Sequence, residues 1–379
     1  MRIVLIFILF SVLFSCEKKT INNGVYSINS RIILGSPTFV NLSEIADSVY
    51  FIKLETNDSA LIDEFPNVVF ADSLLVVTTF RNGVLIFDSK TGKYLYKIEG
   101  FKDRGPQGYS QGTRPLAIDH VDKIVLQKWD RHGIWNYKTG QMCDINLSFS
   151  PYKYTQVLFV NDSLLIGNIL SVPAGGTSKL DVLSANNGSI LREYGLVEMI
   201  DRDYHDIAIF TRSQIYDFEG YIMYYSMIND TIYGVSKTTL ELVPRFVLNL
   251  GDKITPNVPE SKLSNNNYIS ISNICESSRY LFLEFCYSDY CHFVCYDKKE
   301  GKTLYLYKDN FNYLERQNPG FINDISCGLR FFPSFTTNDN RAYYVMQTFE
   351  FISGDPQCAT KMGIMEEDNP IIMVVNLKR

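Results

Sequence analysis

The chain has 379 residues and a formal net charge of −6, and the absence of any basic run argues against nucleic acid as a partner. Tyr and Phe occur 25 times each, and no stretch keeps a helical hydrophobic period over four turns. This composition favours pleated sheet over helix.

The chain begins with the features of a secretory signal. Arg2 precedes an apolar run over residues 3–10, and the sequence SVLFSC then ends at Cys16. This run is shorter than the roughly 20 apolar residues that span a bilayer. The LFSC ending resembles a bacterial lipobox, which implies a signal peptide over residues 1–15, lipidation of Cys16 and a polar tether over residues 16–38. We therefore expect an exported protein, lipid-anchored to the cell envelope on the periplasmic or surface side of the membrane. The alternatives are an ordinary signal peptide with an incidental cysteine, and a membrane-anchor helix.

The rest of the chain repeats a pattern of short strands. A polar turn followed by an apolar strand occurs six times, at ADSLLVV (from residue 71), HVDKIVL (120), NDSLLIG (161), FEGYIMY (218), SSRYLFL (277) and DNRAYYV (339). A strand, a tight turn and a further strand follow each of the first five copies. Each repeat therefore holds four strands, as a blade of a β-propeller does.

The last repeat is short of a strand, because only IIMVVNLKR follows its first half. The strand-like run SVYFIKLET, at residues 48–56, has no partner near it in sequence. We predict that this N-terminal strand joins the last blade, which closes an all-β, six-bladed propeller of four-stranded antiparallel blades over residues 39–379. The alternative is a seven-bladed ring in which residues 42–56 open a blade of their own.

Several segments resemble one known family. FVNLSEIADSVYFIKLET, VLIFDSKTGKYLYKIEG and RGPQGY are similar to the six-bladed propeller lipoproteins of Bacteroidetes, which are related to NHL-repeat propellers. The segment TRPLAIDHVDKIVLQKWDRHGIWNY also resembles one NHL repeat. The resemblance covers nearly the whole mature chain and implies the propeller fold.

The segment DRGPQGY, at residues 103–109, is predicted to connect the first blade to the second. In the family this joint typically reads GRGPGEY, whereas Gln107 and Gly108 stand here in place of its third glycine and its glutamate. We expect the glycines to allow positive φ angles and Pro106 to stiffen the crossing. The Walker phosphate-binding pattern is absent from it.

One face of the predicted ring carries the long loops. The connectors at residues 100–114, 195–212, 251–268 and 308–330 would emerge there, around the channel, together with a longer loop at about residues 348–370. Arg114, Arg212 and Arg330 each precede an inner strand, and we predict that they ring the channel mouth and bind carboxylates, sulfates or phosphates. The alternative is that each pairs with a neighbouring carboxylate. The other candidate ligand-binding residues on this face are Arg104, Tyr109, Trp129, Arg131, His132 and His205.

The cysteines leave several alternatives open. Eight are present, so an odd number remains if Cys16 is lipidated. Cys286 and Cys291 flank a predicted hairpin turn, where a cross-strand disulfide, two buried thiols or a metal site with Cys295 would fit. The nearby His292 does not complete a zinc-ligand spacing. We expect no cofactor, with a divalent metal in the channel as the alternative.

These features predict a monomeric recognition module that binds a glycan or a peptide, including anionic ones, through its loop-rich face. An NHL-like lyase or hydrolase at the same face is the first alternative, with His132, His205 or an acidic residue as catalyst. The acidic run of Glu366, Glu367 and Asp368 is predicted to be a solvated loop tip rather than a catalytic pair. A structural scaffold within an envelope complex is the second alternative.

Overall fold

The structure is a computed structural model, and it describes most of the chain. The described residues are 21–22, 24–28, 38–63, 66–71, 73–79, 81–105, 108–109, 117–118, 123–127, 132–136, 139, 141–145, 154–169, 179–195, 213–226, 230–249, 269–287, 290–310 and 320–379. In this part of the chain no helix is long and apolar enough to cross a bilayer.

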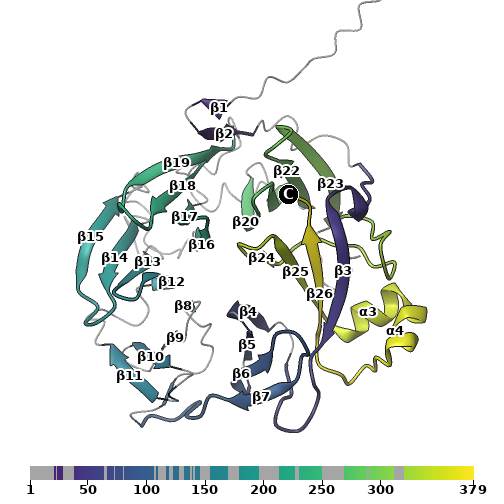
Figure 1. The fold of residues 1–379 in the computed structure, drawn as a ribbon, viewed down its shortest axis with the longest axis horizontal. Helices are drawn as coiled ribbons and strands as arrows, with labels where there is room; N and C mark the ends of the chain where they lie inside the picture. Colours follow the sequence, from purple (N-terminus) through teal and green to yellow (C-terminus); the bar gives the residue numbers. More distant parts are fainter. Residues whose placement is uncertain are drawn as a thin grey trace, which may run out of the picture.

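The described strands form six sheets arranged around a centre, as in a β-propeller (Figure 1). We number them in chain order. Sheet 1 contains β4 (Asn67–Ala71), β5 (Leu74–Thr79), β6 (Gly83–Asp88) and β7 (Tyr94–Lys97). Sheet 2 contains β8 (Ala117–Ile118), β9 (Lys123–Gln127), β10 (His132–Asn136) and β11 (Gln141–Ile145). Sheet 3 contains β12 (Tyr154–Asn161), β13 (Leu164–Ile169), β14 (Lys179–Ser184) and β15 (Ile190–Gly195).

The remaining sheets include both ends of the described chain. Sheet 4 contains β16 (Ser213–Phe218), β17 (Tyr221–Ser226), β18 (Thr231–Ser236) and β19 (Leu242–Val247), extended by β2 (Val25–Ser27) and β1 (Ile21–Asn22). Sheet 5 contains β20 (Ser270–Glu276), β21 (Tyr280–Tyr287), β22 (Tyr290–Asp297) and β23 (Lys302–Asn310). Sheet 6 contains β24 (Phe335–Thr336), β25 (Arg341–Met346), β26 (Ile371–Leu377) and β3 (Ala46–Lys53).

The predicted all-β propeller of four-stranded antiparallel blades is confirmed, but the sheets do not all have the same number of strands. Five sheets have four strands, whereas sheet 4 has six. The prediction of six four-stranded blades is therefore wrong at sheet 4, because β2 pairs in parallel with β19 at Phe246↔Tyr26 and Val247↔Ser27. β1 and β2, the two added strands of sheet 4, come from residues 16–38, which the sequence analysis assigned to a tether.

The predicted N-terminal strand lies beside the last strand of the chain. β3 is antiparallel to β26, in a register that runs from Ile371↔Lys53 to Leu377↔Ala46. The 3₁₀ helix η1 (Leu42–Glu44) leads into β3. The chain thus brings residues more than 300 positions apart in sequence into one sheet.

The hydrophobic core consists of clusters between neighbouring sheets. Sheet 1 packs on sheet 2 through Val76 and Trp135, and clusters of the same kind lie between each later sheet and the next. A further cluster joins sheet 6 to sheet 1, through Tyr343 and Val374 against Leu75. Because each sheet buries both faces against neighbours, the chain needs no single large core.

Two short helices interrupt sheet 6, where the sequence predicted only a long loop. They are α3 (Thr348–Gly354) and α4 (Pro356–Met362), joined at Asp355. The Asp355 side chain caps α4 by accepting the backbone N–H of Cys358, and Gly363 ends the helix at a φ of 63°. We call residues 348–363 the helical cap.

The connector DRGPQGY folds back on sheet 1. The Tyr109 hydroxyl accepts the Val84 N–H at 3.1 Å and donates to the Ile98 carbonyl at 3.0 Å, and its ring is fully buried. Gly108 is needed for close approach rather than for a positive φ, because a Cβ there would lie 2.1 Å from the Asp103 carbonyl oxygen. The connector is therefore a packed structural joint.

Candidate functional site on the channel face

The channel face is the end of the ring where the inner strands begin. In sheets 3 and 4 it includes the first residues of β12 and β16, the end of β13 and the start of β14. The connectors of residues 170–178 and 196–212 leave and enter the strands at this end. This face is where the sequence placed the ligand site.

Two buried polar pairs lie at this end of sheet 3, on opposite faces of the sheet. The Tyr154 hydroxyl donates to Asp181 Oδ2 at 2.6 Å, and the Asn168 amide donates to Ser213 Oγ at 2.7 Å. Asp181 and Asn168 are both fully buried, and Tyr154 is nearly so. A buried carboxylate is costly, and such groups concentrate at functional sites. We call Tyr154 and Asp181 the Asp181 cluster.

Burial fixes the protonation state of the tyrosine in this cluster. It raises the pKa of Tyr154 well above its ordinary value, and the hydrogen bond to Asp181 raises that pKa further. Tyr154 therefore stays a hydrogen-bond donor at any physiological pH. Its ring packs directly against Gly167, where a Cβ would lie 2.5 Å from a ring carbon. Glycine at position 167 thus allows the ring to occupy this place.

Amide side chains join the inner strands along the channel. Gln156 accepts the Ile215 N–H at 2.9 Å, which links sheets 3 and 4. Gln214 accepts the Ile274 N–H at 2.9 Å and donates to the Ile274 carbonyl at 2.8 Å, which links sheets 4 and 5. These amides serve the backbone, so they set the spacing of the sheets around the channel.

At the opposite end of the ring, a hydrogen bond joins sheets 4 and 6. The backbone N–H of Glu219, in a turn of sheet 4, donates to Asn338 Oδ1 of sheet 6 at 3.4 Å. This bond joins a turn of sheet 4 to a turn of sheet 6. The ends of the ring therefore differ, with short bonded turns at one end and long connectors at the other.

The structure does not assemble the predicted arginine ring from the residues that it describes. The guanidinium of Arg330 lies 5.6 Å from the ring centroid of Phe39, in the N-terminal segment. That segment lies beside β23, the last strand of sheet 5, where the Thr38 hydroxyl donates to the Tyr305 carbonyl. Arg330 is therefore beside the N-terminal segment, and Arg114 and Arg212 lie outside the described residues.

The other predicted site residues divide in the same way. Tyr109 is wrong as a ligand contact, because its ring is buried and its hydroxyl is bound to the backbone. Arg104 is exposed in the connector, and His132 begins β10, opposite Gln127 and Ile145. Trp129, Arg131 and His205 lie outside the described residues.

The cysteine cluster of sheet 5 is not arranged as a metal site. Cys286 and Cys291 are direct cross-strand neighbours with their sulfurs 3.6 Å apart, and they remain thiols. His292 makes hydrogen bonds of 2.8 Å with the Tyr305 hydroxyl and 3.2 Å with the Tyr287 carbonyl, so both of its ring nitrogens are occupied. Of the alternatives, two thiols is the arrangement found.

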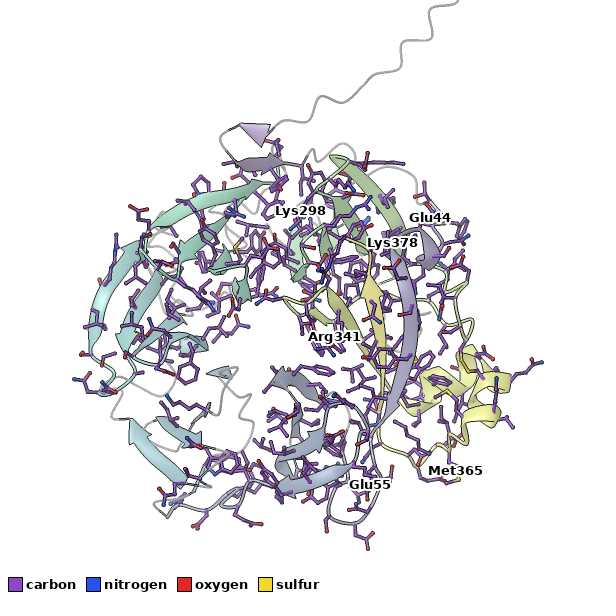
Figure 2. All side chains as sticks on the ribbon, in the orientation of Figure 1. Glu44, Glu55, Lys298, Arg341, Met365 and Lys378 are labelled. Atoms are coloured by element: carbon purple, nitrogen blue, oxygen red, sulfur yellow. A yellow bond between two sulfur atoms is a disulfide. The ribbon has the colours of Figure 1, made fainter. Side chains whose placement is uncertain are left out.

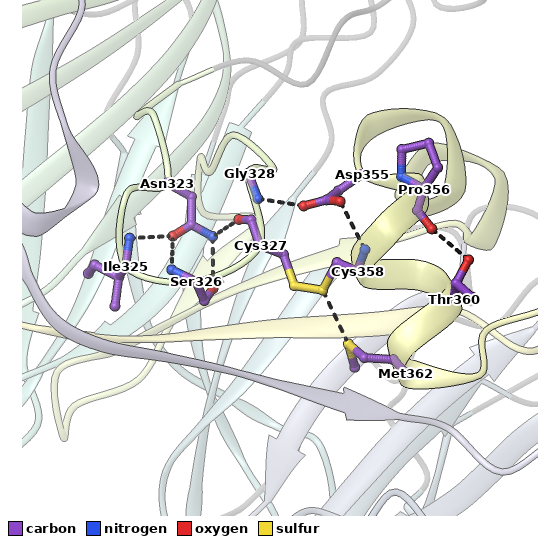
Figure 3. The surroundings of a disulfide bond; sticks show 10 residues. All are labelled: Asn323, Ile325, Ser326, Cys327, Gly328, Asp355, Pro356, Cys358, Thr360 and Met362. Atoms are coloured by element: carbon purple, nitrogen blue, oxygen red, sulfur yellow. Dashed lines mark hydrogen bonds between the residues drawn. A yellow bond between two sulfur atoms is a disulfide. The ribbon is translucent and has the colours of Figure 1, made fainter.

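A disulfide that the sequence did not predict fastens the helical cap. Cys327 bonds to Cys358, and Asp355 accepts the backbone N–H of Gly328 at 2.9 Å (Figure 3). Among the described residues, Cys327, Asp355 and Cys358 are the one group close enough for a metal ion, but two of these ligands form the disulfide. Asp355 in turn caps α4. The group is therefore a structural fastening.

The acidic run beside the cap is only partly a solvated tip. Glu366 and Glu367 are exposed, but Asp368 forms an ion pair of 2.6 Å with Lys53 of β3. Burial by itself would raise the pKa of Asp368, but the hydrogen bonds from Lys53, the Met365 N–H and Thr56, together with the charge of Lys53, outweigh it and hold the pKa below its ordinary value. Asp368 thus ties the last loop to the N-terminal strand.

Comparison with known proteins identifies the family. Residues 25–376 match the family described as a domain of unknown function, DUF4934. The chain belongs to the DUF4934 family. No curated protein matches the sequence.

Solved structures are similar to this DUF4934 chain to different degrees. A crystallised protein from Bacteroides fragilis, named as an exported one, is 19% identical with a TM-score of 0.65, and the match covers 94% of this chain and 100% of that one. The β-propeller domain of Cps50 (Swd1) from Myceliophteria thermophila is 10% identical with a TM-score of 0.37, covering 65% of this chain and 88% of that one. The first similarity supports an all-β propeller.

Proposed function

We propose that the protein is an extracytoplasmic propeller that is lipid-anchored at Cys16 and recognises a glycan or a peptide at its channel face. In this proposal β16–β19 of sheet 4 count as one blade beside the five four-stranded sheets, which makes six blades in all, and the pairing of β3 with β26 closes the ring. The signal-like start of the chain supports export. The B. fragilis relative, named as exported, agrees with that location.

The observation that carries the proposal is the Asp181 cluster. It places a carboxylate and a phenol together at the end of the ring where two long connectors begin. Such a set can accept and donate hydrogen bonds to the hydroxyl groups of a sugar. Arg114 and Arg212, which the sequence analysis places at the channel mouth, would add binding of an acidic substituent on the same ligand.

Recognition fits the described residues better than catalysis does. The histidine that the structure describes with its contacts, His292, has both ring nitrogens bonded within sheet 5. The thiols of Cys275 and Cys295 are buried, and burial raises the pKa of each, which makes both poor nucleophiles. The proposal therefore involves no cofactor, and a monomer suffices for it.

A thermal-shift screen tests the proposal. The soluble chain beginning at Glu17 is exposed to neutral, sulfated and uronic-acid oligosaccharides, to peptides and to divalent metals. A ligand at a hundred times its Kd adds about 2.7 kcal/mol to the free energy of unfolding, which is readily detected. We expect a shift with an oligosaccharide or a peptide.

Three variants make the screen specific. We expect Asp181→Asn to weaken binding of any ligand and Arg114→Ala/Arg212→Ala to weaken binding of acidic ones. Arg330→Ala is the matched control, because Arg330 lies on Phe39 and should leave binding unchanged. A shift with metals alone, or an equal loss of binding in all three variants, would contradict the proposal.

Lipidation needs its own assay. Cells expressing the full chain are supplied with labelled palmitate, and label should enter the wild-type protein but not Cys16→Ser. Label in neither protein would remove the anchor from the proposal and leave the recognition site untouched.

A further inference from the structure

The N-terminal segment is attached to the outer edge of sheet 4. β2 pairs in parallel with β19, and the Ile28 backbone N–H continues the ladder to the Val247 carbonyl at 2.8 Å. The Ile28 side chain is fully buried. The Tyr26 ring stacks on Phe246 with centroids 5.1 Å apart. Backbone and side chains therefore fix this point of the segment.

The same segment is attached again at sheets 5 and 6. Thr38 donates its N–H and its hydroxyl to the Tyr305 carbonyl of β23, at 2.7 and 2.9 Å. The Leu42 N–H donates to the Ile322 carbonyl at 2.7 Å, just before η1 and β3. The segment is thus bound to sheets 4 and 5 and to the stretch at Ile322 before β24, and β3 then continues it into sheet 6. Together, these contacts prevent it from swinging as a free tether.

Chain length then decides where an anchor at Cys16 would hold the ring. A free tether over residues 16–38 could extend to about 75 Å and would set no orientation. Only four residues lie between Cys16 and Ile21 in β1, and the five Cα–Cα steps that join the two span at most about 18 Å. A folded domain of about 340 residues has a radius of gyration near 20 Å, so its width is about 50 Å. The short connection therefore reaches less than half of that width.

The place of β1 identifies the edge that is held. β1 and β2 lie outside the ring beside β19, and β7 of sheet 1 lies on the far side of the ring (Figure 1). The described turns at the end opposite the channel face carry exposed charges, including Glu219, Lys299 and Glu300. A net charge of −6 also opposes close approach of a face to an anionic bilayer.

We propose that the rim of sheet 4, at β1 and β2, faces the lipid bilayer, and that the rim of sheet 1 points away from it. The channel face then opens sideways along the membrane rather than onto it. This orientation rests on the proposed anchor at Cys16 and adds to it the surface that meets the lipid.

Energy transfer to the bilayer tests the orientation. The chain beginning at Cys16 is coupled through that cysteine to a maleimide lipid in phosphatidylcholine vesicles, with Cys16→Ser as the coupling control. A dye is attached through an azide-bearing amino acid in place of Glu241, before β19, or of Leu95, in β7; both residues are exposed. We expect several-fold stronger transfer to a lipid-borne acceptor from position 241 than from position 95. Equal transfer from both positions would overturn the proposal.

A second variant tests whether the attachment of β2 is the cause. Tyr26→Ala/Ile28→Ala should release the residues before Thr38 and make transfer from the two positions equal, while circular dichroism shows that the sheets remain. A difference that persists in this variant would contradict the mechanism. Because the anchor is attached chemically, the result does not depend on lipidation in cells or on the ligand screen, so failure of either proposal is recognised separately.

Discussion

The ion pair between Glu276 and Lys298 gives the sharpest prediction about stability. It lies between sheets 4 and 5, where Lys298 Nζ is 2.9 Å from Glu276 Oε1 (Figure 2). The two side chains are only 6% and 1% exposed. Tyr216 donates to the other carboxylate oxygen at 2.9 Å, and the ammonium group lies 4.4 Å from the Phe218 ring centroid. The carboxylate thus depends on two donors inside the core.

Replacing Lys298 by methionine would leave that carboxylate buried without its cation. Breaking a buried ion pair in this way costs about 3–5 kcal/mol of unfolding free energy, so we expect Lys298→Met to lose that amount at pH 8. Replacing both partners, as in Glu276→Gln/Lys298→Met, should recover most of the loss, because no buried charge remains.

The loss should depend on pH in a defined direction. Burial raises the pKa of Glu276 above its ordinary value of 4.5, and Lys298 opposes that rise. In Lys298→Met the pKa rises further, so the native state holds the proton more tightly than the unfolded chain does. The stability linked to this group is complete below pH 4.5 and is lost as the pH rises through the native pKa. The deficit should therefore be smaller at pH 5 than at pH 8.

Urea unfolding followed by circular dichroism at both pH values measures the deficit. The control is Lys123→Met, because Lys123 pairs with an exposed Asp162 at 3.4 Å and should contribute about 1 kcal/mol or less. An equal deficit of Lys298→Met at pH 5 and pH 8, with no recovery in the double variant, would refute the reasoning.

Three further predictions follow from other parts of the ring. Changing Cys327 and Cys358 to serine removes a cross-link between residues 31 apart, so the chain-entropy relation predicts a loss of about 3–4 kcal/mol in the urea midpoint analysis, and a reductant should then have no further effect on the variant. Gly83→Ala should lower the melting temperature, because position 83 has a φ of 78° and its Cβ would meet the Tyr109 hydroxyl; an unchanged melting temperature would contradict this packing. Tyr154→Phe removes a donor to a buried carboxylate and should cost about 1–3 kcal/mol by urea titration, with a neutral result counting against the Asp181 cluster.

The propeller could be predicted because its determinants are local and repeated. Each sheet is built from adjacent strands joined by short turns, and the turn chemistry is visible in the sequence. The pair Asn82-Gly83 is a strong hairpin signal, and Gly83 begins β6 at a positive φ directly after the turn from β5. The N-terminal strand was found because it lacked a neighbour and β26 lacked a partner.

The departures come from contacts between distant residues. The pairing of Tyr26 with Phe246 and the bond from Cys327 to Cys358 leave no periodic trace in the sequence. The helical cap did leave one, since Asp355-Pro356 is a helix start and Gly363 a helix end. Those signals were enough to predict a helix where the sequence analysis expected only a loop.

The candidate site was harder to predict than the fold. Tyr109 was predicted to contact a ligand, yet its ring fills the core beside Val84. Asp181 was overlooked within KLDVLS, which has the pattern of an ordinary strand. A carboxylate in the middle of an apolar strand is itself a signal, because burying it needs partners from elsewhere in the chain.

The pairing of β3 with β26 also has a consequence for the order of folding. β3 ends at Lys53 and its partner begins at Ile371, so this strand leaves the ribosome long before it can be paired. Most of the other strands find partners within a few tens of residues. The last step of assembly is therefore a single slow encounter between the two ends of the chain. A product truncated before Ile371 would hold β3 and β25 as open edges, ready to pair with another molecule.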